Sequence, residues 1–257
     1  MNYIGIDIGS TCAKTVVLNE KKEIIQEFVQ PTGWSSVDTA EEIHQKLELA
    51  GINLSDDSSC CVATGYGRIS VPYADKAVTE ITCHALGAVH LFHQPDLTVI
   101  DIGGQDTKII QIEQGFVKDF IMNDKCAAGT GRFLEVMANT LSLRPNEMFD
   151  LARLGSDTTI SSMCTVFAES EVIGLIGKGE PKENIAYAVV DSTIRKVTAQ
   201  VSRMNGEMST FCLTGGLCEC EYIRGALSKK LGKEVISSPD ARYAGAIGAA
   251  LRAMKIR

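Results

Sequence analysis

One short pattern occurs twice in this 257-residue chain, and it constrains the fold more than any other feature. An apolar run ends at Asp7-Ile-Gly and is followed by two more strand-like runs, and the same succession surrounds Asp101-Ile-Gly. Strand-like runs that alternate with helical stretches indicate an α/β fold. Two widely separated copies are too few for a solenoid. We therefore predict two α/β lobes, residues 1–93 and 94–240, with a cleft between them.

The other elements follow from apolar periodicity and turn residues. The last helix is rich in Ala and Gly, which permit close packing against another backbone, and we expect residues 241–257 to pack back against the first lobe. The predicted strands are Tyr3–Ile8, Lys14–Leu18, Glu23–Val29, Ser59–Thr64, Leu97–Ile102, Lys108–Glu113, Phe116–Ile121 and Thr210–Leu213. The predicted helices are Val37–Ala50, Glu80–His90, Arg132–Leu141, Val166–Ile176, Ile185–Met204, Tyr222–Leu231 and Ala241–Met254.

Composition excludes several classes of protein. The net charge of -7 disfavours a nucleic-acid partner, whose phosphates would be repelled. No run of 18 or more apolar residues occurs, so we expect no membrane span. The segment Met1–Gly9 is predicted to be a strand and not a signal peptide, because no basic region precedes an apolar run. We accordingly expect a cytoplasmic protein.

The two Asp-Ile-Gly turns carry the groups that bind phosphate. Glycine lets a backbone approach a ligand closely, and successive N–H groups can form an anion nest. A lysine can reach a phosphate, and a carboxylate at a strand end can hold a hydrated magnesium ion. For each turn alone, a plain hairpin is the alternative. The first turn supplies Asp7, Gly9, Ser10, Thr11 and Lys14, and the second supplies Asp101, Gly103, Gly104, Gln105 and Asp106.

A third glycine turn, Thr214-Gly215-Gly216, also follows an apolar run. The three turns together resemble those of the actin, sugar-kinase and heat-shock-70 ATPase superfamily. The resemblance implies two ribonuclease H-like lobes with ATP in the cleft, phosphates on the first two turns and adenosine on the third. Competing nucleotide motifs are absent: no P-loop occurs, and Gly129-x-Gly131 lacks the strand-then-helix context of a dinucleotide site.

Two cysteine segments narrow the resemblance to one family. The segment Asn123-Asp-Lys-Cys126-Ala-Ala-Gly-Thr-Gly-Arg-Phe-Leu-Glu135 and the segment Ser162-Met-Cys164-Thr-Val-Phe-Ala-Glu-Ser-Glu171 resemble the activators of 2-hydroxyacyl-CoA dehydratases. The ATPase subunits of benzoyl-CoA reductase are relatives of that family. The resemblance covers essentially the whole chain. It implies a 4Fe–4S cluster held between two subunits by Cys126 and Cys164 of each.

The chemistry of the two cysteines agrees with a shared cluster. A 4Fe–4S cluster usually takes four thiolates, so two per chain supply half of a site that a two-fold axis completes. We expect Cys126 and Cys164 each to begin a helix, whose positive end stabilises an anionic cluster. A pair of buried thiols is the alternative.

The resemblance also implies a role for each residue. Asp7 and Asp101 would hold Mg²⁺ through water, and Gln105 or Asp106 would orient the attacking water, with Gln105 preferred. Gly215, Gly216 and Glu135 would meet the adenosine of ATP or ADP. A reduced ferredoxin or flavodoxin would load one electron, which ATP would drive on to a 2-hydroxyacyl-CoA dehydratase or a related double-cubane-type iron–sulfur protein. The phosphates would lie on Gly9, Ser10, Thr11, Lys14, Gly103 and Gly104.

The other cysteines are predicted to be structural. Cys60, Cys61 and Cys83 lie in predicted core segments, and Cys12 lies in a turn whose backbone does the binding. Cys212, Cys218 and Cys220 are spaced closely enough for a metal site but lack a nearby fourth ligand. Gly65-Tyr-Gly-Arg68 is either a glycine turn or a contact with the partner protein.

Two rival functions remain open on the sequence. A sugar or acid kinase of the same superfamily would need a substrate pocket and a catalytic carboxylate, and it would leave Cys126 and Cys164 unused. A nucleotide-gated redox sensor would hold a cluster without turning over ATP for a partner.

Overall fold

The computed structural model describes residues 1–54, 56, 58–161, 164–206 and 210–256. The chain divides into two compact units. The first comprises Met1–Leu97, Ile110–Lys118 and Asp240–Arg257, and the second comprises Thr98–Ile109 and Asp119–Pro239. No helix in the described part of the chain is both long enough and apolar enough to cross a membrane.

The first sheet has five strands in the order β3-β2-β1-β4-β5. β1 pairs antiparallel with β2 and parallel with β4. The elements up to residue 92 are β1 (Asn2–Ile8), β2 (Cys12–Leu18), β3 (Ile24–Pro31), α1 (Ser36–Leu49), β4 (Ser59–Thr64), a 3₁₀ turn (Arg68–Ser70), β5 (Lys76–Ala77) and α2 (Glu80–Phe92).

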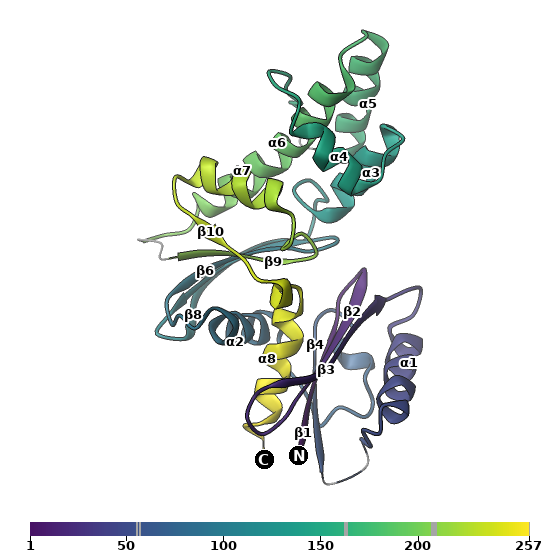
Figure 1. Cartoon of the computed structure of the whole chain (residues 1–257), viewed down its shortest axis with the longest axis vertical. Helices are drawn as coiled ribbons and strands as arrows, with labels where there is room; N and C mark the ends of the chain where they lie inside the picture. Colours follow the sequence, from purple (N-terminus) through teal and green to yellow (C-terminus); the bar gives the residue numbers. More distant parts are fainter. Residues whose placement is uncertain (55, 57, 162–163, 207–209, 257) are drawn as a thin grey trace. The chain divides into compact units, whose positions relative to one another are not determined.

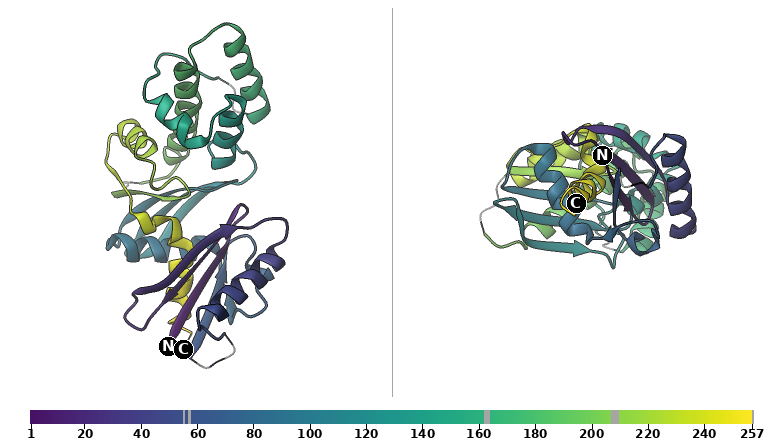
Figure 2. Two further views of the ribbon diagram at one scale, coloured as in Figure 1. Left: turned by 45° about the vertical axis from the view of Figure 1, so that its right-hand side comes forward. Right: turned by 90° about the horizontal axis from the view of Figure 1, so that it is seen from below.

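Alternation along β1 sends its side chains to two different layers. Ile4, Ile6 and Ile8 are buried on the face that packs against α1, whose Ile43 and Leu47 meet them. The residues between them face the last helix, α8 (Ala244–Ala253), which packs on the opposite face with α2 against it (Figure 1). β1 and α8 thus lie side by side although they come from opposite ends of the sequence (Figure 2).

Glycine allows α8 to approach the sheet and α2 at backbone distance. Gly5 of β1 lies against the backbone of Ala246, and Gly87 of α2 lies against the backbone of Ala244. Gly248 of α8 lies against the backbone of Cys83. A Cβ at any of these glycines would collide with main-chain atoms, which cannot move aside as a flexible side chain can.

The second sheet has five strands in the order β10-β9-β6-β7-β8, which matches the first sheet strand for strand. Its apolar face carries Ile100, Ile102, Ile109, Phe211 and Leu213, which pack against helices of the second unit. The elements are β6 (Leu97–Ile102), β7 (Thr107–Glu113), β8 (Phe116–Asn123), α3 (Gly131–Thr140), α4 (Pro145–Ala152), α5 (Thr165–Gly177), α6 (Lys182–Val201), β9 (Thr210–Gly215), α7 (Glu221–Leu231), β10 (Val235–Ile236) and a 3₁₀ turn (Pro239–Tyr243).

The fold confirms the predicted α/β class and the predicted strands, with differences at their ends. β2 begins at Cys12, two residues before the predicted start at Lys14. The helix predicted from Ala241 is a 3₁₀ turn up to Tyr243, and the α-helix begins only at Ala244. The sequence analysis missed α4, which begins with Pro145 behind a cap formed by Arg144 and Glu147.

The close approach of α2 and α8 makes a prediction about stability. Gly87→Ala should destabilise the protein by about 1–3 kcal/mol, because the added methyl group meets the backbone of α8. Gly225→Ala is the matched control, since nothing lies within 4 Å of a Cβ there and alanine favours the helix. Thermal unfolding of the two variants measures the difference. Equal melting temperatures would contradict the proposed backbone contact.

Candidate functional site

The first Asp-Ile-Gly turn, between β1 and β2, is held by hydrogen bonds from its own backbone and from Thr32. Gly9 N–H donates to the Cys12 carbonyl at 3.1 Å. The hydroxyl of Thr32 donates to the Gly9 carbonyl at 2.7 Å, and Thr32 N–H donates to the Thr11 carbonyl at 2.9 Å. Ser10 and Thr11 are exposed at the tip. The turn is therefore held by the residue that follows β3, while its tip stays open to solvent.

Asp7 is the last residue but one of β1 and is buried, with 6% of the residue exposed. The carboxylate lies between Gly65, which follows β4, and Gly245 of α8, and a Cβ at either glycine would collide with it. Lys14 is directly opposite Asp7 in the β1–β2 pairing, so both side chains project from the same face of the sheet. A carboxylate and a lysine thus stand together beside an open glycine turn.

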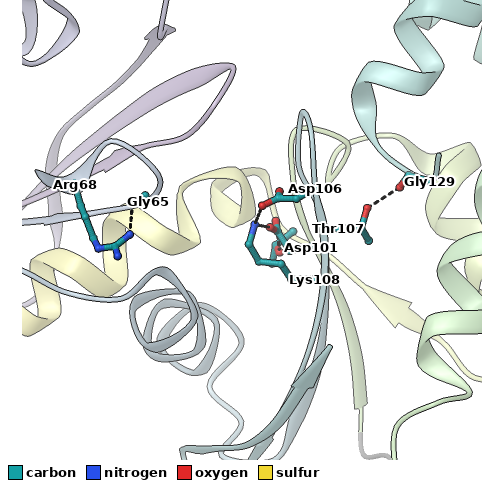
Figure 3. A network of polar contacts seen from close by, with 8 residues as sticks. Gly65, Arg68, Asp101, Asp106, Thr107, Lys108 and Gly129 are labelled. Carbon is teal, nitrogen blue, oxygen red and sulfur yellow. Dashed lines mark hydrogen bonds and ion pairs between the residues drawn. The ribbon is translucent and has the colours of Figure 1, made fainter. Parts of the chain in front are cut away.

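The second turn is built around a triad of charged side chains, of which Asp101 and Lys108 are buried and Asp106 is half-buried. Lys108 is 1% exposed, and its Nζ lies 2.8 Å from Asp106 Oδ2 and 3.4 Å from Asp101 Oδ2 (Figure 3). Thr214 of β9 donates its hydroxyl to Asp101 Oδ1 at 3.1 Å. Gly215 follows with φ +84°, and a Cβ there would lie 2.7 Å from the Asp101 carboxylate. Asp101 thus repeats the position of Asp7 at the end of a central strand beside a glycine.

The sequence analysis missed Lys108 as a site residue. Asp101 and Lys108 have the seven-residue spacing of Asp7 and Lys14, so the pattern Asp-Ile-Gly-x-x-x-x-Lys occurs in both copies. The two lysines differ in environment, because Lys14 is half-buried whereas Lys108 is enclosed by carboxylates.

The tip of the second turn rests on the start of α3. Gly131 N–H donates to the Gly103 carbonyl at 2.9 Å, and Arg132 N–H donates to the Gly104 carbonyl at 2.8 Å. Gln105 is exposed at the tip, where it can contact a ligand or water. Glu135 is also exposed, one turn into α3, and pairs with Arg132 at 2.8 Å. The glycine carbonyls are thus held by α3, which leaves the exposed side of the turn for a ligand.

The third turn follows β9, the neighbour of β6 in the sheet. Cys218 N–H donates to the Gly215 carbonyl at 3.2 Å, and Gly216 is exposed. The structure therefore brings Asp101, Thr214 and Gly215 together within the second unit.

The two cysteines of the family-like segments lie in different local structures. Cys164 is exposed and directly precedes α5, where its carbonyl accepts the Ala168 N–H at 2.8 Å, so the prediction that it begins a helix is confirmed. The same prediction for Cys126 is wrong. Cys126 lies half-buried in the loop before α3, because Gly129 adopts φ +87° and delays the helix to Gly131. Ser162 and Met163 of the second segment lie outside the described residues.

Most other cysteines are core thiols. Burial raises the pKa of the Cys83 thiol to about 11, and it also raises the pKa of the Cys61 and Cys212 thiols. These thiols stay protonated near neutral pH, whereas a metal ligand must be a thiolate. Within the residues that the structure describes, no group of three or more His, Cys, Asp or Glu side chains is arranged to hold a metal, and this includes Cys212, Cys218 and Cys220.

The triad of Asp101, Asp106 and Lys108 leads to a second prediction. Lys108→Met should destabilise the protein by about 3–5 kcal/mol, because it leaves the Asp101 and Asp106 carboxylates without the cation between them. Lys118→Met removes an exposed ion pair with Glu113 and should change stability by no more than about 0.5 kcal/mol. Denaturant unfolding compares the two variants. A Lys108 variant as stable as the control would show that the triad is not a stabilising unit.

The sequence is similar to proteins of known function over its whole length. It is 45% identical to the (R)-2-hydroxyglutaryl-CoA dehydratase activating ATPase of Acidaminococcus fermentans, over 98% of this chain and 96% of that protein. The crystal structure of component A of that dehydratase superposes with a TM-score of 0.91 at 43% identity, over 100% of this chain and 98% of that one. The structure of the activator of the 2-hydroxyisocaproyl-CoA dehydratase from Clostridium difficile, with bound ADPNP, superposes with a TM-score of 0.89 at 34% identity. That match covers 100% of this chain and 95% of the other.

More distant structures confirm the predicted superfamily fold. A glucokinase of the ROK family from Streptomyces griseus gives a TM-score of 0.64 at 16% identity, over 99% of this chain and 100% of that one. At that identity the likeness concerns the fold alone. The model of the BadF/BadG/BcrA/BcrD ATPase family matches residues 4–253. Since that match covers nearly the whole chain, the protein belongs to the BadF/BadG/BcrA/BcrD ATPase family.

Proposed function

We propose that this protein is an ATP-dependent one-electron reductase that activates an iron–sulfur partner enzyme through a 4Fe–4S cluster shared by two copies of the chain. The observation that carries the proposal is the accessibility of Cys164 and Cys126, since one is exposed and the other half-buried. Both stand in segments that resemble those of the dehydratase activators. A bound cluster would supply a carrier for one electron at low potential. Cys126 and Cys164 would hold it.

The surface next to Cys164 is suited to contact with a second copy of the chain. α5 begins at the next residue and exposes apolar side chains along its length, among them Val166 and Phe167 at 67% each and Ile173 at 56%. Apolar side chains gathered on one helix usually mark an interaction site. A two-fold axis beside Cys164 would cover this surface on both copies and bring four cysteines together.

The nucleotide roles follow from the geometry of the turns. Asp7 and Asp101 would hold Mg²⁺ through water, because both are buried carboxylates at strand ends beside glycines. Gln105 is exposed at its turn and would orient the attacking water, with Asp106 held by Lys108. Glu135 and the Gly215–Gly216 turn would meet the adenosine. The phosphates would lie on Gly9, Ser10, Thr11, Lys14, Gly103 and Gly104.

The relatives point to the kind of partner. Two that are 45% and 41% identical are named as activators of 2-hydroxyglutaryl-CoA and lactoyl-CoA dehydratases. We infer that the electron acceptor here is a 2-hydroxyacyl-CoA dehydratase or a double-cubane-type iron–sulfur protein, and that the donor is a ferredoxin or flavodoxin. The sugar-kinase alternative is supported by the fold alone.

Cysteine substitution tests the proposed cluster. Anaerobically reconstituted protein should carry about four irons per dimer, and Cys126→Ala or Cys164→Ala should abolish the iron while nucleotide affinity stays within about threefold of the parent value. Iron analysis and calorimetry with ATP measure the two properties.

Cys218→Ala and Cys220→Ala are the controls, and both should retain iron. If only the two control variants lost iron, the cluster ligands would be Cys218 and Cys220, and the proposed assignment to Cys126 and Cys164 would be wrong. Four irons bound per monomer would contradict the shared site.

The two turns also predict a contrast between binding and hydrolysis. Gln105→Ala should bind ATP normally and hydrolyse it slowly, because Gln105 carries no charge for phosphate but can orient water. Lys14→Ala should bind ATP about tenfold to hundredfold more weakly, because it loses a charge-assisted contact. Calorimetry and single-turnover hydrolysis separate the two effects. Parent-like hydrolysis by the Gln105 variant would shift the water-orienting role to Asp106.

A further inference from the structure

The loop that carries Cys126 is held together by side chains. Asn123 Nδ2 donates to the Cys126 carbonyl at 2.8 Å and to the Ala128 carbonyl at 3.2 Å. The hydroxyl of Thr130 donates to the Ala127 carbonyl at 2.6 Å. Three consecutive carbonyls of the loop therefore take hydrogen bonds from the loop's own side chains, so residues 123–130 should move as one body.

The next carbonyl, that of Gly129, is bound from another part of the chain. The hydroxyl of Thr107 donates to it at 2.7 Å in a buried position (Figure 3). Thr107 is 0% exposed and begins β7, directly after the second Asp-Ile-Gly turn. Gly129 itself rests on Lys196 of α6, since a Cβ there would lie 2.9 Å from the lysine Cγ. The loop is thus fixed at one point by the side chain of the residue that directly follows the second Asp-Ile-Gly turn.

Thr107 binds the carbonyl of Gly129 through its side chain. Among the described residues, the start of α3 also contacts the turn: the N–H groups of Gly131 and Arg132 donate to the carbonyls of Gly103 and Gly104, and these hydrogen bonds join main chain to main chain. Thr107 stands between Asp106 and Lys108, whose ion pair at 2.8 Å belongs to the triad around Asp101. A shift of the turn on binding a phosphate would therefore move the Thr107 hydroxyl and, with it, the Gly129 carbonyl.

We propose that Thr107 is the positioning residue that transmits the nucleotide state of the second turn to the Cys126 loop. The proposal rests on the proposed function of the two turns and of Cys126. Thr107 touches neither nucleotide nor cluster in this assignment, and it acts only through the Gly129 carbonyl. The cysteine loop then follows the turn as a rigid body, because its remaining carbonyls are already bound internally.

Hydrogen exchange of residues 124–130 in the full-length chain tests the proposal with and without Mg·ADPNP. In the parent protein, exchange should change about fivefold to tenfold on binding, the equivalent of about one hydrogen bond. Thr107→Val keeps the shape of the side chain and removes the hydrogen-bond donor. The ratio of the exchange rates without and with Mg·ADPNP should therefore fall to about one, while the affinity for Mg·ADPNP stays within about threefold of the parent value. Thr107→Ser keeps the hydroxyl and should restore the response.

Thr130→Val is the matched control, because it removes a hydrogen bond inside the loop. Its exchange should be faster in both states, with the response to nucleotide retained. A parent-like response in Thr107→Val, or no response in a parent protein that binds Mg·ADPNP, would overturn the coupling. Failure of the parent protein to bind Mg·ADPNP would contradict the proposed function, and the coupling with it. If valine disturbs folding, Thr107→Ala removes the same donor.

Discussion

A carboxylate buried at the end of a central strand imposes the main constraint on each unit of this protein. Removing such a group from water is costly unless it finds partners. Asp101 has them in Thr214 and Lys108, and Asp7 is enclosed on two sides. The enclosure is only possible because glycine stands at Gly65, Gly215 and Gly245, where a Cβ would collide with a carboxylate oxygen. The glycines of both units are thus required by the carboxylates, whatever ligand the turns bind.

The two units use one topology in different ways. The strand orders β3-β2-β1-β4-β5 and β8-β7-β6-β9-β10 are equivalent. In the first unit a single helix, α1, leads from the third strand to the fourth. In the second unit four helices, α3 to α6, occupy the same connection, and both Cys126 and Cys164 lie within it. This insertion starts next to the β6–β7 turn, because the topology places β7 beside β8. A cysteine loop can therefore be linked to a glycine turn by one side chain.

The local pattern of the sequence predicted much of the fold and part of the site. The strands were predictable because buried apolar residues such as Ile4, Ile6 and Ile8 recur at a period of two. The expectation that Cys126 begins a helix was wrong, because Gly129 adopts a left-handed backbone conformation that the apolar pattern does not report. Lys108 was open to prediction from its spacing to Asp101. The bond from Thr107 to Gly129 was not, since it joins residues 22 apart in sequence and depends on how the turn and the loop pack.

The position of α8 has a consequence for how the protein is made. The central strand β1 is synthesised before the other elements of its unit, yet α8, the helix that covers one of its faces, is synthesised after all of them. Until residue 244 and those after it emerge, Gly5 and the Asp7 carboxylate lack their neighbours in α8, Ala246 and Gly245. Contacts this distant in sequence form slowly, and exposed strand surface is prone to aggregation in the meantime. The first unit should therefore complete its core only after α8 has been synthesised, so nascent chains would depend on chaperones for longer than the order of their strands suggests.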